Sequence, residues 1–104
     1  MTETQKSISM WANETFGSSG SNMRVAVRAN EEMAELLRAL SVDDNNQKAL
    51  DECTDVVIVL CRLVERLGGD FCELIDAKMR INRSREWKKD GSGHGYHVRE
   101  KAAS

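Results

Sequence analysis

Two pairs of acidic residues stand out because each pair has the spacing of one helical turn. Glu32 and Glu35 lie in the segment NEEMAE, and Glu52 and Asp55 lie in DECTD. Residues three apart on a helix share a face, so each pair would present two carboxylates side by side. If the two helices form an antiparallel hairpin, the pairs can face each other. Like charges about 4 Å apart repel by roughly 1 kcal/mol even in water, so four of them would need a cation.

The expected cation is Mg²⁺, a hard ion that binds carboxylate oxygens and retains several waters. Mn²⁺ prefers the same oxygen ligands and is expected to substitute for it. Neither His94 nor His97 lies near the acids in the sequence, which argues against zinc. The alternative is that the acids form solvated helix faces, which are common on charge-rich helices. The spacing alone leaves both interpretations open.

A second polar set lies in the segment KMRINRSREW. Lys78, Asn82 and Arg85 are separated by four and three residues, which predicts one stripe along a helix face. Such a stripe suits a polyphosphate, because an arginine can hold two phosphate oxygens at once. The alternative is the basic end of a soluble helix, which the helix dipole favours.

The elements that must position these residues are four predicted helices. A polar or glycine-containing loop, FGSSGSN or SVDDNNQ, separates the first three, and Gly68-Gly69 predicts the end of the third. Ser21 or Asn22 is the expected N-cap of the second helix, and Asp43 or Asp44 that of the third. The expected ranges are about Ser7 to Thr15, Asn22 to Leu40, Asn46 to Leu67 and Phe71 to Trp87.

The run from Val56 to Leu60 decides both the fold class and the expected assembly. Its β-branched residues favour a strand, but apolar residues from Ala49 to Leu67 recur at steps of three and four, which predicts a helix. The run covers every side of that helix, so neighbours should enclose it all round. A chain of 104 residues has a small core. We therefore expect an all-α, four-helix bundle-like fold that a second subunit completes.

Composition narrows the class of protein. The net charge of −2 gives no reason to expect nucleic-acid binding, and no apolar stretch approaches the roughly 20 residues that span a bilayer. The N-terminal segment MTETQKSISMW is polar, and three cysteines without paired spacing are read as small buried apolar residues. These features predict a cytoplasmic protein with one domain over residues 1–90. Residues 91–104, which include His94 and His97, are expected to form a flexible or loosely docked tail.

The acidic and basic segments together resemble a known family. EEMAE, sixteen intervening residues and ECTD match the EExxE…ExxD signature of the MazG-like, all-α nucleoside triphosphate pyrophosphohydrolases, and KMRINRSREW supplies the Lys, Asn and Arg that these proteins tend to carry downstream. The resemblance covers about residues 22–87. It implies that Mg²⁺ is bound by Glu32, Glu35, Glu52 and Asp55, and that the triphosphate is contacted by Lys78, Asn82 and Arg85. Glu31 would help to activate water or would face solvent.

The resemblance implies hydrolysis of a (deoxy)nucleoside triphosphate to the monophosphate and pyrophosphate. Trp11 is a candidate for stacking on the base, although core packing is the more common role of Trp11, Phe16 and Trp87 taken singly. The expected partners are the nucleotide and further copies of the chain, as a dimer or tetramer. The alternative is a non-enzymatic helical interaction module whose acids are solvated and whose valines face a partner.

Overall fold

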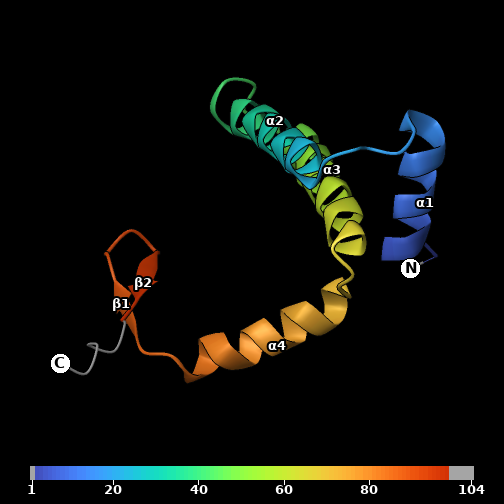
Figure 1. Cartoon of the computed structure of the whole chain (residues 1–104). Coiled ribbons are helices and arrows are strands. Elements are labelled where there is room, and N and C mark those ends of the chain that lie inside the picture. Colours follow the sequence, from blue (N-terminus) through green and yellow to red (C-terminus); the bar gives the residue numbers. More distant parts are fainter. Residues whose placement is uncertain (1, 99–104) are drawn as a thin grey trace. The chain divides into compact units, whose positions relative to one another are not determined.

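The computed structural model describes residues 2–98, which form four helices followed by a short β-hairpin (Figure 1). The predicted all-α class is confirmed, with the hairpin as the exception. The chain divides into two compact units, Met1–Phe71 and Cys72–Ser104. The elements are α1 (Gln5–Phe16), α2 (Asn22–Ser41), α3 (Asn46–Arg66), α4 (Phe71–Ser84), β1 (Trp87–Lys89) and β2 (Gly95–His97).

Capping side chains explain where the first two helices begin. Thr4 and Ser7 form a capping box at the start of α1, so this helix begins two residues earlier than predicted. Ser21, one of the two predicted N-caps, accepts a hydrogen bond from the Arg24 backbone N–H at 3.3 Å and caps α2.

The predicted N-cap of α3 was wrong by one residue. Asn45 caps this helix, because its side-chain oxygen accepts a hydrogen bond from the Lys48 backbone N–H at 3.1 Å. Asp44 instead adopts a left-handed conformation with φ of 45°. The Asp43 carboxylate accepts a hydrogen bond from Lys48 Nζ at 2.8 Å. Both aspartates therefore shape the turn between α2 and α3 rather than cap the helix.

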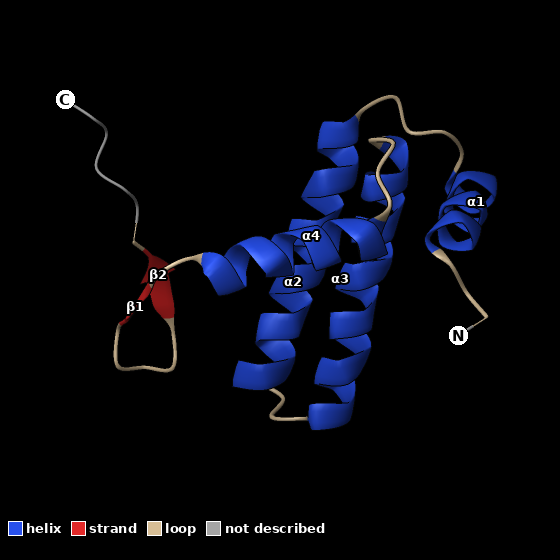
Figure 2. Cartoon of the chain, turned by 90° about the horizontal axis from the view of Figure 1, so that it is seen from below, coloured by secondary structure: helices blue, strands red, loops and turns tan. Residues whose placement is uncertain are grey.

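In the first unit, α2 and α3 run side by side as a helical hairpin, and α1 packs against α3 (Figures 1 and 2). Gln5 ties the start of α1 to the turn that follows α3, since its side chain donates to the Gly69 carbonyl at 2.7 Å and accepts from the Phe71 N–H at 2.6 Å. Among the described residues, no large side chain is fully buried. The buried apolar residues are Ala12, Val25, Ala39, Ala49, Val56 and Cys61.

The valine run is helical, as predicted, but this chain does not enclose it. Val56 is buried, Val57 is 52% exposed, and Ile58 to Leu60 are half-buried. Leu37 on α2 and Leu50 on α3 are 58% and 61% exposed. Apolar side chains on both helices of the hairpin are thus open to solvent in a single copy. Completion of the bundle by a second subunit stays a prediction.

The second unit differs from its predicted form at the end of α4. This helix ends at Ser84 and not near Trp87, because Trp87 begins a strand and pairs with His97. The Trp87 indole N–H donates to the Asn82 carbonyl at 2.7 Å and covers the helix end. The sequence predicts a flexible tail from residue 91, whereas residues 95–97 form strand β2. Residues 99–104 lie outside the described residues, and the domain boundary at residue 90 stays a prediction.

The cysteines and the helix lengths bear on two further expectations. None of the three cysteines, all of which lie within the described residues, forms a disulfide bond. Only Cys61 is buried, so the reading as buried apolar residues was wrong for Cys53 and Cys72. No helix in the described part of the chain is long and apolar enough to span a membrane.

Candidate metal centre

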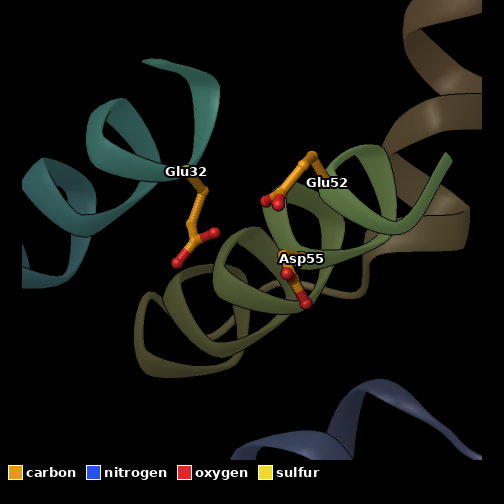
Figure 3. Close-up of side chains that lie close together, drawn as sticks. All are labelled: Glu32, Glu52 and Asp55. Atoms are coloured by element: carbon orange, nitrogen blue, oxygen red, sulfur yellow. The ribbon is translucent and has the colours of Figure 1, made fainter. Parts of the chain in front are cut away.

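Three carboxylates meet where α2 and α3 pack together. Glu32 of α2 and Glu52 and Asp55 of α3 each place one oxygen within 4.8 Å of the others (Figure 3). The last two side chains share a face because they lie three residues apart on one helix. The turn after α2 brings Glu32 opposite them. Glu32, Glu52 and Asp55 are called the acidic cluster below.

Glu35, the fourth predicted ligand, lies at the edge of the acidic cluster. It follows Glu32 by about one helical turn, and its carboxylate helps to raise the pKa of both Glu32 and Glu52. Its own side chain is exposed. The structure thus brings together all four predicted acids, three of them as a tight group.

The acidic cluster is electrostatically strained. Burial raises the pKa of Glu32, and the charges of Glu35 and Asp55 add to this rise, while the Arg28 guanidinium opposes it. Burial likewise raises the pKa of Glu52, together with the neighbouring Glu35, Asp55 and Glu32 carboxylates. Glu32 is only 5% exposed, so water does not screen its charge. The alternative of a solvated acidic face would require such screening.

The donor set fits a hard divalent cation. The Oε2 atoms of Glu32 and Glu52 are both buried and have no hydrogen-bond partner within the described residues. Such oxygens destabilise the folded chain, because burial removes their hydrogen bonds to water and no other hydrogen bond replaces them. Mg²⁺ and Mn²⁺ take such oxygens as ligands. Glu32, Glu52 and Asp55 could therefore hold one of these ions, with Glu35 beside them.

Glu31 does not join the acidic cluster. Its side chain is 57% exposed and pairs with Arg28, whose Nη1 lies 2.6 Å from Glu31 Oε2. The other terminal nitrogen of Arg28, Nη2, lies 2.7 Å from Glu32 Oε1. One guanidinium therefore links the exposed Glu31 to the buried Glu32.

A cavity of about 780 Å³ opens beside the acidic cluster in the first unit. Its lining includes Glu32 and Asp55 together with Trp11 and Phe16, whose ring centroids lie 5.4 Å apart in an edge-to-face arrangement. Its volume falls in the range of about 300–1,000 Å³ that is typical of small-molecule sites. Carboxylates and aromatic rings thus line one space. The cavity also contains the cationic side chains Arg24, Arg28 and Arg62.

These three arginines were missed in the sequence, and Phe16 was named only as one of three aromatic residues of which one could stack on the base. A signal was present for Arg28, which precedes Glu32 by four residues, and for Arg62, which follows Asp55 by seven and shares its helix face. The positions of Arg24 and Phe16 depend on how the loop between α1 and α2 folds back, which helical spacing does not predict.

Two arginines of α3 hold both ends of that loop. Arg62 Nη2 donates to Asn13 Oδ1 at 3.1 Å and to the Gly17 carbonyl at 2.9 Å, at the end of α1. One turn later, Arg66 Nε donates to Asn22 Oδ1 at 2.7 Å, at the start of α2. The same helix that carries Glu52 and Asp55 thus fixes the loop that walls the cavity.

The predicted basic stripe belongs to the second unit. Lys78 and Asn82 lie on α4, the former exposed and the latter half-buried. Arg85 lies just beyond the end of the helix at Ser84. The prediction that all three residues form a stripe on one helix was therefore wrong. Their role as phosphate contacts stays a prediction.

Comparisons with known proteins agree with this geometry. No family model matches the sequence. A curated dATP/dGTP diphosphohydrolase of Cyanophage S-2L is 35% identical over 68 residues, which cover 64% of this chain and 65% of that relative. The match thus spans less than two thirds of the relative's length. A solved structure of the Cyanophage S-2L MazG-like pyrophosphohydrolase bound to dGDP and three catalytic Mn²⁺ ions per active site is similar with a TM-score of 0.74. It is 28% identical, over 93% of this chain and 91% of that one.

Proposed function

We propose that the chain is a MazG-like enzyme, which its similarity to the two Cyanophage S-2L proteins supports. It would hydrolyse a (deoxy)nucleoside triphosphate to the nucleoside monophosphate and pyrophosphate, using Mg²⁺ or Mn²⁺. The observation that carries this proposal is the acidic cluster with its orphaned buried oxygens, two of whose residues, Glu32 and Asp55, line a cavity of suitable size. The relative's substrates, dATP and dGTP, and the dGDP bound in the solved structure make purine deoxynucleotides the first compounds to test.

The acidic cluster is the proposed seat of the metal. Glu32, Glu52 and Asp55 would hold the cation, and Glu35 would complete the set from the edge. A divalent cation bound there supplies Lewis acidity toward the phosphate chain and lowers the pKa of a bound water. The protein contributes placement, because α2 and α3 fix the carboxylates before the substrate arrives.

The cavity walls suggest how the nucleotide is oriented. Its phosphate chain would lie beside Glu32 and Asp55, where the Arg28 guanidinium, which contacts Glu32, offsets negative charge. The base would lie toward Trp11 and Phe16, since aromatic faces stack on nucleobases. Lys78, Asn82 and Arg85 are proposed as further triphosphate contacts, by resemblance to the family.

The reaction class is tested by identifying products. The purified protein is incubated with dATP, dGTP and a panel of other natural and modified triphosphates, with Mg²⁺ or Mn²⁺, and the products are separated by chromatography. We expect monophosphate and pyrophosphate in equal amounts. Glu32→Gln serves as the control for contaminating enzymes, because it should abolish the products. Diphosphate and orthophosphate from the wild type, absent from this control, would refute the proposed bond cleavage.

A non-enzymatic interaction module is the second candidate. It is favoured by the exposed apolar side chains of the helical hairpin, such as Leu37, Leu50 and Val57. This function predicts a melting temperature that does not depend on Mg²⁺, and no products from any triphosphate. The two measurements together separate it from the enzyme.

We further propose that the enzyme is a cytoplasmic homo-oligomer, a dimer or tetramer, without nucleic-acid or membrane partners. The same exposed apolar side chains support association, since burying them would add apolar area to a small core. The net charge of −2 supports the lack of nucleic-acid binding.

A further inference from the structure

The Arg28 guanidinium makes contacts of two kinds on its own helix. It pairs with Glu31, which is 57% exposed, and with Glu32, whose side chain is only 7% exposed. Residues three and four positions later on a helix lie next to Arg28 in space, so the backbone itself sets this geometry. Glu32 is thus the buried end of a chain of charges that runs Glu31, Arg28, Glu32.

The two oxygens of Glu32 have different surroundings. Oε1 lies 2.7 Å from Arg28 Nη2, whereas Oε2 is buried and has no partner in the described part of the chain. Because Arg28 occupies Oε1, the carboxylate plane is fixed and Oε2 is left for another group. Glu32 also belongs to the acidic cluster, in which one oxygen from each residue lies within 4.8 Å of the others.

We propose that Arg28 is a positioning residue of the metal centre: it holds Glu32 by one oxygen and presents the other to the cation, while Glu31 holds Arg28. This inference rests on the metal site proposed above. Carboxylate ligands of metals are commonly fixed by hydrogen bonds of this kind, and losing such a partner costs about tenfold to 100-fold in metal affinity.

The role of Glu31 follows from the same contacts. Its carboxylate lies on the exposed side of Arg28 and does not belong to the acidic cluster. It acts on the metal centre only through the guanidinium, and it restricts the rotamers that Arg28 can adopt. Removing Glu31 should therefore matter only while Arg28 is present.

The inference is tested by Mn²⁺ binding to the full chain without nucleotide, followed by electron paramagnetic resonance of the free ion. Arg28→Gln should weaken Mn²⁺ binding by about tenfold or more. Arg28→Lys should restore part of the affinity, because a lysine can still reach Glu32. Arg24→Gln is the matched control: it removes the same charge one turn earlier on α2, in the wall of the same cavity. It should change the affinity by no more than about twofold, since it leaves the Glu32 contact intact. Melting in EDTA verifies that each variant is folded.

A double-mutant cycle tests the order of the chain of charges. Glu31→Gln should weaken Mn²⁺ binding less than Arg28→Gln does, and the double variant should match Arg28→Gln alone. Additive losses would overturn the role of Glu31. Equal affinities of Arg28→Gln and Arg24→Gln would overturn the role of Arg28. Tighter binding in Arg28→Gln would also overturn it, by showing that the guanidinium competes with the metal. A wild type that binds no Mn²⁺ would instead refute the metal site, and the proposed function with it.

Discussion

Replacing Asp55 by Asn tests whether the acidic cluster is held together against its own repulsion. Asp55 lies in the middle of α3, far from either helix cap, and its side chain is exposed. It contributes to the raised pKa of both Glu32 and Glu52. Asn has almost the same volume as Asp, so the substitution removes one charge and little else. A stabilising effect without metal would show that repulsion outweighs any structural role of the Asp55 carboxylate.

The size of this effect follows from the separation of the carboxylates. At 4.8 Å, the upper limit for the oxygens of the acidic cluster, two full charges repel by about 0.9 kcal/mol in the dielectric of water. Asp55 has two such partners, but its side chain is exposed, so water and salt screen both repulsions. Relief of about 1 kcal/mol is therefore expected, which raises the melting temperature by roughly 4 to 8 °C in a domain of this size.

Metal binding should reverse the order of the two proteins. At a Mn²⁺ concentration 100 times the dissociation constant, the wild type gains about 2.7 kcal/mol by mass action. If loss of one ligand weakens binding about 100-fold, the variant gains only about 0.4 kcal/mol at the same concentration. The variant should thus melt above the wild type in EDTA and below it in excess Mn²⁺.

The assay is a set of thermal melts of both proteins in EDTA and in excess Mn²⁺, with one measurement of hydrolysis. Asp51→Asn is the control, because Asp51 is an exposed residue one turn earlier on α3 and lies outside the acidic cluster. Its melts should follow the wild type in both buffers. If Asp55→Asn melts lower than the wild type in EDTA and keeps near-normal hydrolysis, Asp55 is not a metal ligand.

Three other outcomes are expected. Lys78→Ala and Arg85→Ala should each raise KM more than they lower kcat, since each would remove a proposed charged phosphate contact, and such contacts are worth about 1.5–3 kcal/mol. Unchanged steady-state kinetics in both variants would exclude these contacts. Light scattering at micromolar concentration should give a dimer or larger, and Val57→Lys should lower this mass; a wild type that is monomeric throughout would contradict the assembly. In EDTA the melting temperature should rise as the pH falls from about 7 toward 5, because the raised pKa values of Glu32 and Glu52 make the folded chain bind protons before the unfolded chain does. The double variant Glu32→Gln/Glu52→Gln should lack this rise, and an equal rise in both proteins would assign it to other groups.

Helices and acidic pairs were predictable because their signals are local. The apolar spacing from Ala49 to Leu67 predicts α3 to within one residue of its observed end at Arg66. The spacing of Glu52 and Asp55 places them on one face wherever that helix lies. An antiparallel hairpin is enough to place them opposite Glu32, and the short polar linker between the two helices favours such a hairpin.

The remaining features depend on contacts between distant parts of the chain. Strand β1 forms because Trp87 pairs with His97 across a glycine-rich turn, and the composition of that turn is equally typical of a flexible tail. The cavity depends on Arg62 meeting the end of α1, 45 residues away in sequence. The exposure of Val57 could not be predicted either, since a run of apolar residues shows the need for burial but not what supplies it.

Because both ends of the α1–α2 loop are anchored to α3, the shape of the cavity wall and the metal site could evolve independently. Arg62 and Arg66 hold its two ends to α3, and between them lie only Ser18, Ser19, Gly20 and the capping Ser21. Changing the length of a surface loop costs little free energy, because the closure entropy grows slowly with length. Insertions or substitutions between the anchors would reshape the cavity wall while Glu52 and Asp55 stay in place on α3. A lineage could therefore change which nucleotide it accepts without rebuilding its metal chemistry.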